Sequence, residues 1–196
     1  MAGQIIVAIG REFGSGGHAI AEKIAKELGI KMYDRNMLDE IAQEKNIKVE
    51  VLEKLDEQPK KLILSRRVGA YSNSFEEILA DMQFEYIEKK ADSGESFVVV
   101  GRCAESVLSG REELISIFVL GDKSVKKERV KELYNLSDME ASSKMHRHDR
   151  KRKQYHNRHA DNKWGDSRGY DICINSSRLG VDKTADILIA YIKERM

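Results

Sequence analysis

The sequence predicts an α/β protein of three layers, in which a parallel sheet of about five strands carries helices on both faces. Apolar runs of strand length alternate with segments of helical periodicity along the whole chain, an order typical of parallel sheets. The run 96–100 ends in consecutive apolar residues, as in a strand that is covered on both sides. A length of 196 residues, 41% of them hydrophobic, is enough for one core, so we treat 1–196 as a single domain.

The N-terminal half begins with a strand, a glycine-rich turn and a helix. Residues 4–9 form an apolar run rich in β-branched side chains, and 19–28 repeat apolar residues at helical spacing until Gly29 ends the pattern. The elements predicted after this helix are a short strand at 30–33, one or two helices over 35–55 with a break near Asn46, a loop at 58–61 around Pro59, and a helix over 74–91.

The C-terminal half continues the alternation. We expect strands at 96–100, 114–120 and 171–175, and helices at 104–108, 124–134, 137–159 and 182–195. Ser137 and Glu140 form a capping box that marks the start of the helix 137–159. Cys173 alternates with two isoleucines in the last strand and is therefore predicted to lie in the core. The segments 35–94 and 141–169 are predicted to extend from the sheet as excursions.

Composition excludes several classes of protein. The formal net charge of +1 gives no overall attraction to nucleic acid. No stretch reaches the ~18–20 consecutive apolar residues of a membrane span, and the N-terminus lacks the features of a signal peptide. The 2 cysteines are too few for a disulfide framework or a Cys-rich zinc site. We therefore expect a cytoplasmic protein with reduced thiols and no membrane contact, and the sequence leaves a homo-oligomer open.

The glycine-rich stretch REFGSGGH follows the first predicted strand and opens the first helix. Glycines allow successive backbone N–H groups to curl around an anion, and a helix N-terminus adds partial positive charge. The residues predicted to cradle phosphate groups in this context are Gly14, Ser15, Gly16 and Gly17. The alternative is a tight strand-to-helix turn that binds no ligand.

The same stretch, with Gly14 and Gly16, resembles the P-loop pattern G-x-x-x-x-G-K-[ST], in the register where Gly16 takes the second glycine position and Gly14 lies between the two. It departs from that pattern at three positions. Arg11 stands at the first glycine, Gly17 at the lysine, and His18 at the Ser/Thr that would hold Mg²⁺. The lysine normally contacts the β- and γ-phosphates, so ordinary ATP chemistry needs another cation in its place.

Arg11 and Arg102 are candidates for that cation. Both follow predicted strands at the carboxyl edge of the sheet, where open α/β folds bind ligands. The alternative for each is a structural ion pair, for instance with Glu12 or Glu105. Cys103 comes next at a helix N-terminus, a place that can lower the pKa of a thiol, but no base stands beside it in the pattern of a catalytic cysteine.

Three further stretches resemble a known family. They are Val98-Val99-Val100-Gly101-Arg102, the segment 33–38 (YDRNML), and the segment 170–180 (YDICINSSRLG). Together with the loop they are similar to bacterial cytidylate kinases, and the chain resembles the cytidylate kinase-like branch of the P-loop kinases nearly from end to end. The resemblance implies a P-loop kinase fold in which 35–94 binds the acceptor and 141–169 forms a basic lid.

The resemblance also implies roles for residues at two strand ends. Arg102 would bind the phosphate of the acceptor, and Asp34 would open the acceptor site. Cytidylate kinases carry acids near Mg²⁺ where this chain has Val100 and Cys103. Asp34 is therefore the nearest candidate to contact the metal that accompanies the nucleotide.

The segment 144–158 (KMHRHDRKRKQYHNR) has seven basic side chains and one acid, Asp149, for a local charge of +6. Nucleoside-monophosphate kinases close a lid with arginines over the transferring phosphate, so the resemblance implies this role for Arg150 and Arg152, with Asp149 contacting substrate or orienting an arginine. A solvated helix face is the alternative, and nucleic-acid binding is disfavoured by the low net charge. The histidines here lack acidic or thiol partners at useful spacing, so no protein metal centre is predicted.

The sequence therefore predicts a phosphotransferase that moves the γ-phosphate of ATP, bound with Mg²⁺, to a small acceptor, with a pyrimidine nucleoside monophosphate expected. The alternative is a nucleotide-binding or sensing domain that has lost catalysis, which the missing lysine favours. A basic partner-binding protein is a third reading. Trp164 and Tyr170 are expected to anchor the segment 141–169 to the core.

Overall fold

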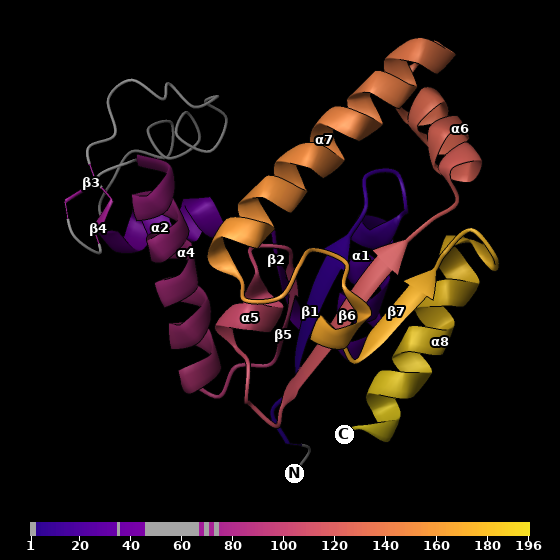
Figure 1. The fold of residues 1–196 in the computed structure, drawn as a ribbon. Helices are drawn as coiled ribbons and strands as arrows, with labels where there is room; N and C mark the ends of the chain where they lie inside the picture. Colours follow the sequence, from indigo (N-terminus) through magenta and orange to yellow (C-terminus); the bar gives the residue numbers. More distant parts are fainter. Residues whose placement is uncertain (1–2, 35, 46–66, 69–70, 73–74) are drawn as a thin grey trace.

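The computed structural model describes residues 3–34, 36–45, 67–68, 71–72 and 75–196 (Figure 1). Its main sheet has five parallel strands in the order β2-β5-β1-β6-β7, which confirms the predicted fold class. The strands are β1 (Ile6–Arg11), β2 (Lys31–Tyr33), β5 (Phe97–Val100), β6 (Leu114–Leu120) and β7 (Ile172–Asn175). All their carboxyl ends meet at one edge, which is where the glycine-rich stretch leaves β1.

Helices cover both faces of this sheet (Figure 1). One face carries α1 (Gly17–Leu28) and α8 (Gly180–Glu194), and the other carries α2 (Met37–Lys45), α4 (Phe75–Asp92) and α5 (Ala104–Val107). The helices α6 (Lys123–Tyr134) and α7 (Asp138–His159) lie beyond the carboxyl edge, and the short helix η1 (Ser167–Gly169) leads back to β7. A small antiparallel pair, β3 (Arg67–Val68) and β4 (Tyr71–Ser72), was not predicted by the sequence.

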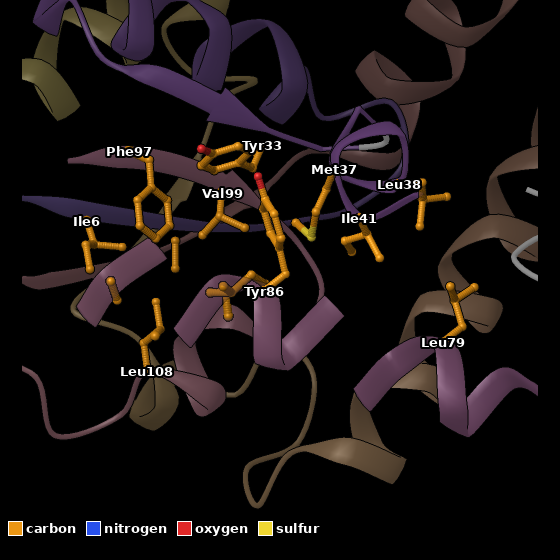
Figure 2. Packing of buried hydrophobic residues seen from close by; sticks show 14 of the residues in the cluster. Ile6, Tyr33, Met37, Leu38, Ile41, Leu79, Tyr86, Phe97, Val99 and Leu108 are labelled. Carbon is orange, nitrogen blue, oxygen red and sulfur yellow. The ribbon is translucent and has the colours of Figure 1, made fainter. Parts of the chain in front are cut away.

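The two faces of the sheet bury alternating side chains. Along β1, Ile6 and Ala8 join the cluster under α2, α4 and α5, whereas Val7 and Ile9 join the cluster under α1 and α8. Figure 2 shows the first cluster, in which the ring of Tyr33 packs edge-on at 5.3 Å from Phe97 and 5.6 Å from Tyr86.

Buried polar atoms of the first cluster are hydrogen-bonded. The Tyr33 hydroxyl donates to Glu95 Oε1 at 2.7 Å, and the Tyr86 hydroxyl donates to Glu40. Burial raises the pKa of both phenols, which keeps them neutral hydrogen-bond donors. Hydroxyls that pair with carboxylates in this way let aromatic rings fill the core without leaving a polar atom unsatisfied.

Three sequence predictions need correction. Helix α8 begins at Gly180, two residues before its predicted start at 182. Helix α1 begins at Gly17, two residues before the predicted start, because the end of the glycine run already has helical geometry. The prediction that Cys173 lies in the core is wrong, since its side chain is exposed. Its strand, β7, is an edge strand of the sheet. Ile172 and Ile174 pack on the cluster under α1 and α8, and Cys173, between them, points to the opposite face.

The predicted break near Asn46 and the predicted loop around Pro59 lie outside the described residues. The capping box is present as predicted, with Ser137 Oγ accepting from the Glu140 N–H and the Glu140 carboxylate accepting from the Ser137 N–H. None of the helices in the described part of the chain has the length and apolar content that crossing a membrane requires.

Candidate functional site

The glycine-rich loop is held in a fixed shape at the carboxyl end of β1. Gly14 and Gly16 have φ values of +82° and +80°, in the left-handed region that favours glycine. A Cβ on Gly14 would lie 2.8 Å from Val130, and one on Gly16 would lie 2.6 Å from Val181. Both glycines are therefore required by the path of the loop and by its close approach to α6 and α8.

Ser15 is buried beneath this loop. Its hydroxyl donates to the Glu12 carbonyl at 2.9 Å and accepts from the Gly17 N–H at 3.3 Å, while its own carbonyl accepts from Ser176 Oγ at 2.5 Å. These contacts shape the loop from within. Gly16, the N-cap of α1, brings no side chain that could cap the helix, so N–H groups of the first turn stay open to an anion at the positive end of the helix dipole.

Arg11 extends from the end of β1 across the sheet edge. A Cβ on Gly17 would lie 2.6 Å from Arg11 Cβ, and a Cβ on Gly101 would collide with Arg11 Nη1. The guanidinium group lies 3.6 Å from Asp34 Oδ1, and His18 Nδ1 lies 3.1 Å from Asp34 Oδ2. Arg11 and Asp34, at the ends of β1 and β2, are thus brought together with His18 of α1 beside the loop.

The end of β5 has an unusual backbone. Gly101, Arg102 and Cys103 have successive φ values of +78°, +59° and +53°. Left-handed backbone at two residues with side chains costs energy, and such strain is typical of functional sites. The turn brings Arg102 to the cleft described below. Burial raises the pKa of the Cys103 thiol to about 12, so the helix N-terminus does not make it a reactive thiolate.

Helix α7 contacts the site through one face. Asp149, Arg152 and His156 are three and four residues apart, which places them on the same side of the helix. Asp149 Oδ1 accepts from the Phe13 N–H at 2.6 Å, Arg152 Nη1 donates to the Arg11 carbonyl at 3.2 Å, and His156 Nε2 lies 2.6 Å from Glu105 Oε1. These contacts tie α7 to the loop, to β1 and to α5.

Arg150 is placed differently from Arg152. Its side chain is exposed and lies outside the lining of the cleft, whereas Arg152 is half-buried within it. Burial lowers the pKa of the Arg152 guanidinium, and the nearby carboxylates of Asp149 and Asp34 oppose this effect. Of the two arginines predicted for the lid, the structure brings only Arg152 to the loop.

A buried cation that sequence reasoning missed lies under the loop. Lys126 Nζ is 2.8 Å from Glu12 Oε2 and 3.7 Å from Asp149 Oδ2, and the Gly121 N–H donates to the same Glu12 oxygen at 3.0 Å. Burial raises the pKa of Asp149, with the neighbouring Lys126 acting against it. Asp149 therefore holds the loop in this structure, and the sequence offered no signal to separate Lys126 from the other lysines of α6.

An aromatic stack joins the loop to α7. The Phe13 ring lies 4.2 Å from the His148 ring at an interplanar angle of 9°, and 5.9 Å from the Tyr134 ring. Burial lowers the pKa of His148 to about 4, with Arg152 and other cations of α7 adding to the effect. The stacked imidazole is therefore neutral at physiological pH, and the basic patch carries less charge here than its histidines suggest.

These elements enclose one cleft with a volume of about 1130 Å³. Several residues from outside the predicted set line it as well, including Glu105, Tyr134 and His156. The predicted site residues that line it are Arg11, Gly14, Gly16, Gly17, His18, Asp34, Arg102 and Arg152. Trp164 and Tyr170 pack at 5.4 Å and 5.1 Å from the ring of Phe118 in β6, as the predicted anchor of the segment 141–169 requires.

The described residues contain no group of three His, Cys, Asp or Glu side chains placed to hold a metal ion by themselves. Mg²⁺ in nucleotide sites is commonly held by one or two carboxylates together with the phosphates of the substrate. The Asp34 carboxylate, which lines the cleft beside the loop, fits that role. A single carboxylate of this kind would be sufficient only with a nucleotide present.

The fold and the site define the class of P-loop kinases. The features that do so are the parallel sheet, the glycine-rich loop at its carboxyl edge and the arginines around the cleft. The cytidylate kinase-like family matches residues 6–178, and the chain belongs to that family. A crystal structure of an uncharacterized protein from Eubacterium ventriosum is 41% identical, with a TM-score of 0.77, over 97% of this chain and 99% of that chain. No protein among those with curated functions matches the chain.

More distant structures share the fold alone. A sugar kinase from Janibacter sp. is 16% identical with a TM-score of 0.55, over 97% of this chain and 95% of that chain. A shikimate kinase from Acinetobacter baumannii, in complex with shikimate, is 12% identical with a TM-score of 0.55, over 98% and 94%. The family and the fold are those of kinase-type phosphotransferases.

Alanine substitutions at Gly14 and Gly94 separate two contributions to the free energy of unfolding, that of the backbone conformation and that of packing. Gly94 has φ +77° with open space around its Cβ position, whereas Gly14 has φ +82° and Val130 at 2.8 Å. Gly94→Ala should cost about 1–2 kcal/mol of unfolding free energy, and Gly14→Ala about 1–3 kcal/mol more. Urea denaturation of both variants measures the difference, and equal losses would contradict the close approach of the loop to α6.

The low pKa of His148 predicts a pH dependence. Because the folded-state pKa is about 4, below the ordinary value of 6.5, the unfolded chain takes up the proton first as pH falls. Stability should therefore decrease between pH 6.5 and 4, and His148→Phe should reduce this decrease. Melting temperatures at pH 7.5 and 5 test this, with equal values for both proteins at pH 7.5 showing that the stack is kept. An unchanged drop in the variant would refute the assignment.

Proposed function

We propose that this protein transfers the γ-phosphate of ATP to a small acceptor, with a pyrimidine nucleoside monophosphate as the acceptor that its family suggests. One observation supports this most. Arg11 of β1, Arg102 of the turn after β5 and Arg152 of α7 line one cleft together with the glycine-rich loop. Phosphoryl transfer requires mainly positioning and positive charge around the transferring group, and this arrangement supplies both.

The donor site of this proposal is the loop. Backbone N–H groups of Gly14, Gly16 and His18, at the N-terminus of α1, would bind the phosphates of ATP. Those of Ser15 and Gly17 donate to the Glu12 carbonyl and to Ser15 Oγ and keep the loop in shape, so little reorganisation is needed on binding. Asp34 would hold Mg²⁺ together with those phosphates. The metal, when bound, neutralises charge on the β- and γ-phosphate oxygens.

The acceptor site lies toward β5 and β2. Arg102, at the strained turn after β5, would bind the acceptor phosphate, and Asp34 stands at the end of β2 on the same side. The segment 35–94 would bind the acceptor, as the family resemblance implies. An oxygen of the acceptor phosphate is already ionised near neutral pH, so the attack on the γ-phosphate needs no side-chain nucleophile.

The segment 141–169 would act as the basic lid over the transferring phosphate. Arg152 would stabilise its charge, since it donates to the Arg11 carbonyl and so stands next to the loop. Its guanidinium suits a phosphoryl group because it offers several N–H donors in a fixed plane. Arg150, which faces solvent, is the weaker of the two lid assignments.

A second candidate is a domain that binds nucleotide without transferring phosphate. Three residues favour it: Gly17 at the lysine of the general P-loop pattern, His18 at its Mg²⁺ ligand, and Val100 where cytidylate kinases proper carry an acid. The two candidates differ in one respect. A kinase must bind donor and acceptor together in one cleft, whereas a sensor needs a single ligand.

Thermal denaturation with ligands tests the proposed function. ATP with Mg²⁺ should raise the melting temperature, since a ligand that binds only the folded protein stabilises it by about 2.7 kcal/mol at 100 times its dissociation constant. CMP, dCMP or UMP should enlarge that shift by more than the sum of the separate shifts. ADP release should then require the same monophosphate.

Variants make this test specific. Arg102→Ala should remove the additional shift from the monophosphate while keeping the shift from ATP. Arg168→Ala is the matched control, because Arg168 is exposed and pairs with Asp166 outside the cleft. A shift from one ligand that no partner enlarges would favour the sensor, and no shift with any ligand would overturn both candidates.

A further inference from the structure

Two of the three departures from the P-loop pattern involve residues that touch each other. Arg11 occupies the first glycine position and Gly17 the lysine position. A Cβ on Gly17 would lie 2.6 Å from Cβ of Arg11 and 3.1 Å from its Cγ. These Arg11 atoms are next to the backbone of β1 and cannot move aside as the end of a flexible side chain can. A side chain at position 17 is therefore excluded while Arg11 keeps its place.

A second glycine opens the path of the Arg11 side chain. Gly101, at the end of β5, has φ +78°, and a Cβ there would collide with Arg11 Nη1. The side chain thus passes between Gly17 and Gly101 and carries its guanidinium group to a point between the loop and the β5–β2 side of the cleft. In the proposed function this is where the donor and acceptor phosphates meet.

A carboxylate holds the Arg11 guanidinium at this point, and a second arginine holds the Arg11 backbone. Asp34 lies 3.6 Å from it, and the side chains of this pair are only 16% and 20% exposed. Arg152, from α7, donates to the Arg11 backbone carbonyl at 3.2 Å. Arg11 and Arg152, from distant parts of the chain, therefore lie side by side next to the loop. Little water reaches them there, so charge–charge interactions are strong.

We propose that the substitutions at positions 11 and 17 are a single exchange. The cation that contacts the terminal phosphates of ATP is supplied by Arg11 from the end of β1, and Gly17 is the residue that leaves room for it. This inference rests on the proposed function and deepens it by naming the group that replaces the P-loop lysine. It favours Arg11 over Arg102 as the replacement for the lysine, because Arg11 is the residue that packs against position 17.

The exchange changes the chemistry of the cation. A guanidinium group stays charged at all physiological pH values and can bind two phosphate oxygens with parallel N–H donors, whereas an ammonium group acts as a point charge. Phosphate oxygens would compete with Asp34 for Arg11. Release of Asp34 from this pair would free its carboxylate for Mg²⁺ in the same step as nucleotide binding.

A double-variant cycle tests the exchange. The variants are Arg11→Gly, Gly17→Lys and the combination of both, which restores the P-loop pattern at these two positions. The combination should bind Mg²⁺–ATP at least about tenfold more tightly than Arg11→Gly alone, since one charge-assisted contact is regained. Gly17→Lys alone should lower the melting temperature of the free protein, and the added Arg11→Gly should recover part of that loss.

Two further variants act as controls. Arg11→Lys keeps a cation at position 11 and should retain more ATP affinity than Arg11→Gly. Lys23→Ala removes an exposed cation of α1 that pairs with Asp182 outside the cleft, and it should leave ATP affinity unchanged. Calorimetric titration with Mg²⁺–ATP and melting temperatures without ligand are measured for every variant, so that binding and folding are read separately.

The outcomes distinguish the inference from the function on which it rests. If the wild-type protein binds ATP and Arg11→Gly binds it equally well, the inference is overturned and the proposed function stands. A folded double variant that binds no better than Arg11→Gly also overturns it. If the wild-type protein binds no ATP, the proposed function fails together with the inference. Recovery of both melting temperature and affinity in the double variant would support the exchange.

Discussion

An ammonium group with almost no contact with solvent, that of Lys126, joins the glycine-rich loop to the two helices beyond it. It lies between a carboxylate of the loop, Glu12, and a carboxylate of α7, Asp149, while Lys126 itself belongs to α6. Loss of one partner from such a buried set leaves an uncompensated charge and is strongly destabilising. The loop, α6 and α7 therefore form one unit, and the placement of Arg152 over the loop depends on it.

The position of the site follows from the parallel sheet. Because all five strands run the same way, the residues that follow β1, β2 and β5 meet at one edge, and Arg11, Asp34 and Arg102 are brought together although they are far apart in sequence. The left-handed run at Gly101–Cys103 adds strain at the same edge. The buried pair of Glu105 and His156 connects α5, which begins directly after this turn, to α7.

Much of this could be predicted from the sequence, for physical reasons. Apolar runs such as FVVV indicate a strand buried on both faces. The glycines between β1 and α1 indicate a backbone conformation that costs other residues energy. The side of α7 that faces the loop could not be predicted from charge alone. Arg150 and Arg152 are equally basic, and it is the burial of Ala141 and Met145 against Val130 that decides which of them faces the loop. Lys126 was missed and Cys173 was wrongly placed in the core, because the burial of each depends on neighbours that the local sequence does not encode.

The contact between Arg11 and Gly17 also constrains how this loop can change by descent. A chain with side chains at both positions has a steric clash, and a chain with glycine at both has no cation at either position. Neither position can therefore change independently of the other. A change from one arrangement to the other, made one substitution at a time, passes through a loop that has either a steric clash or no cation. Positions 11 and 17 should therefore covary. Members of the family that carry glycine at position 17 are expected to carry a long basic side chain at position 11.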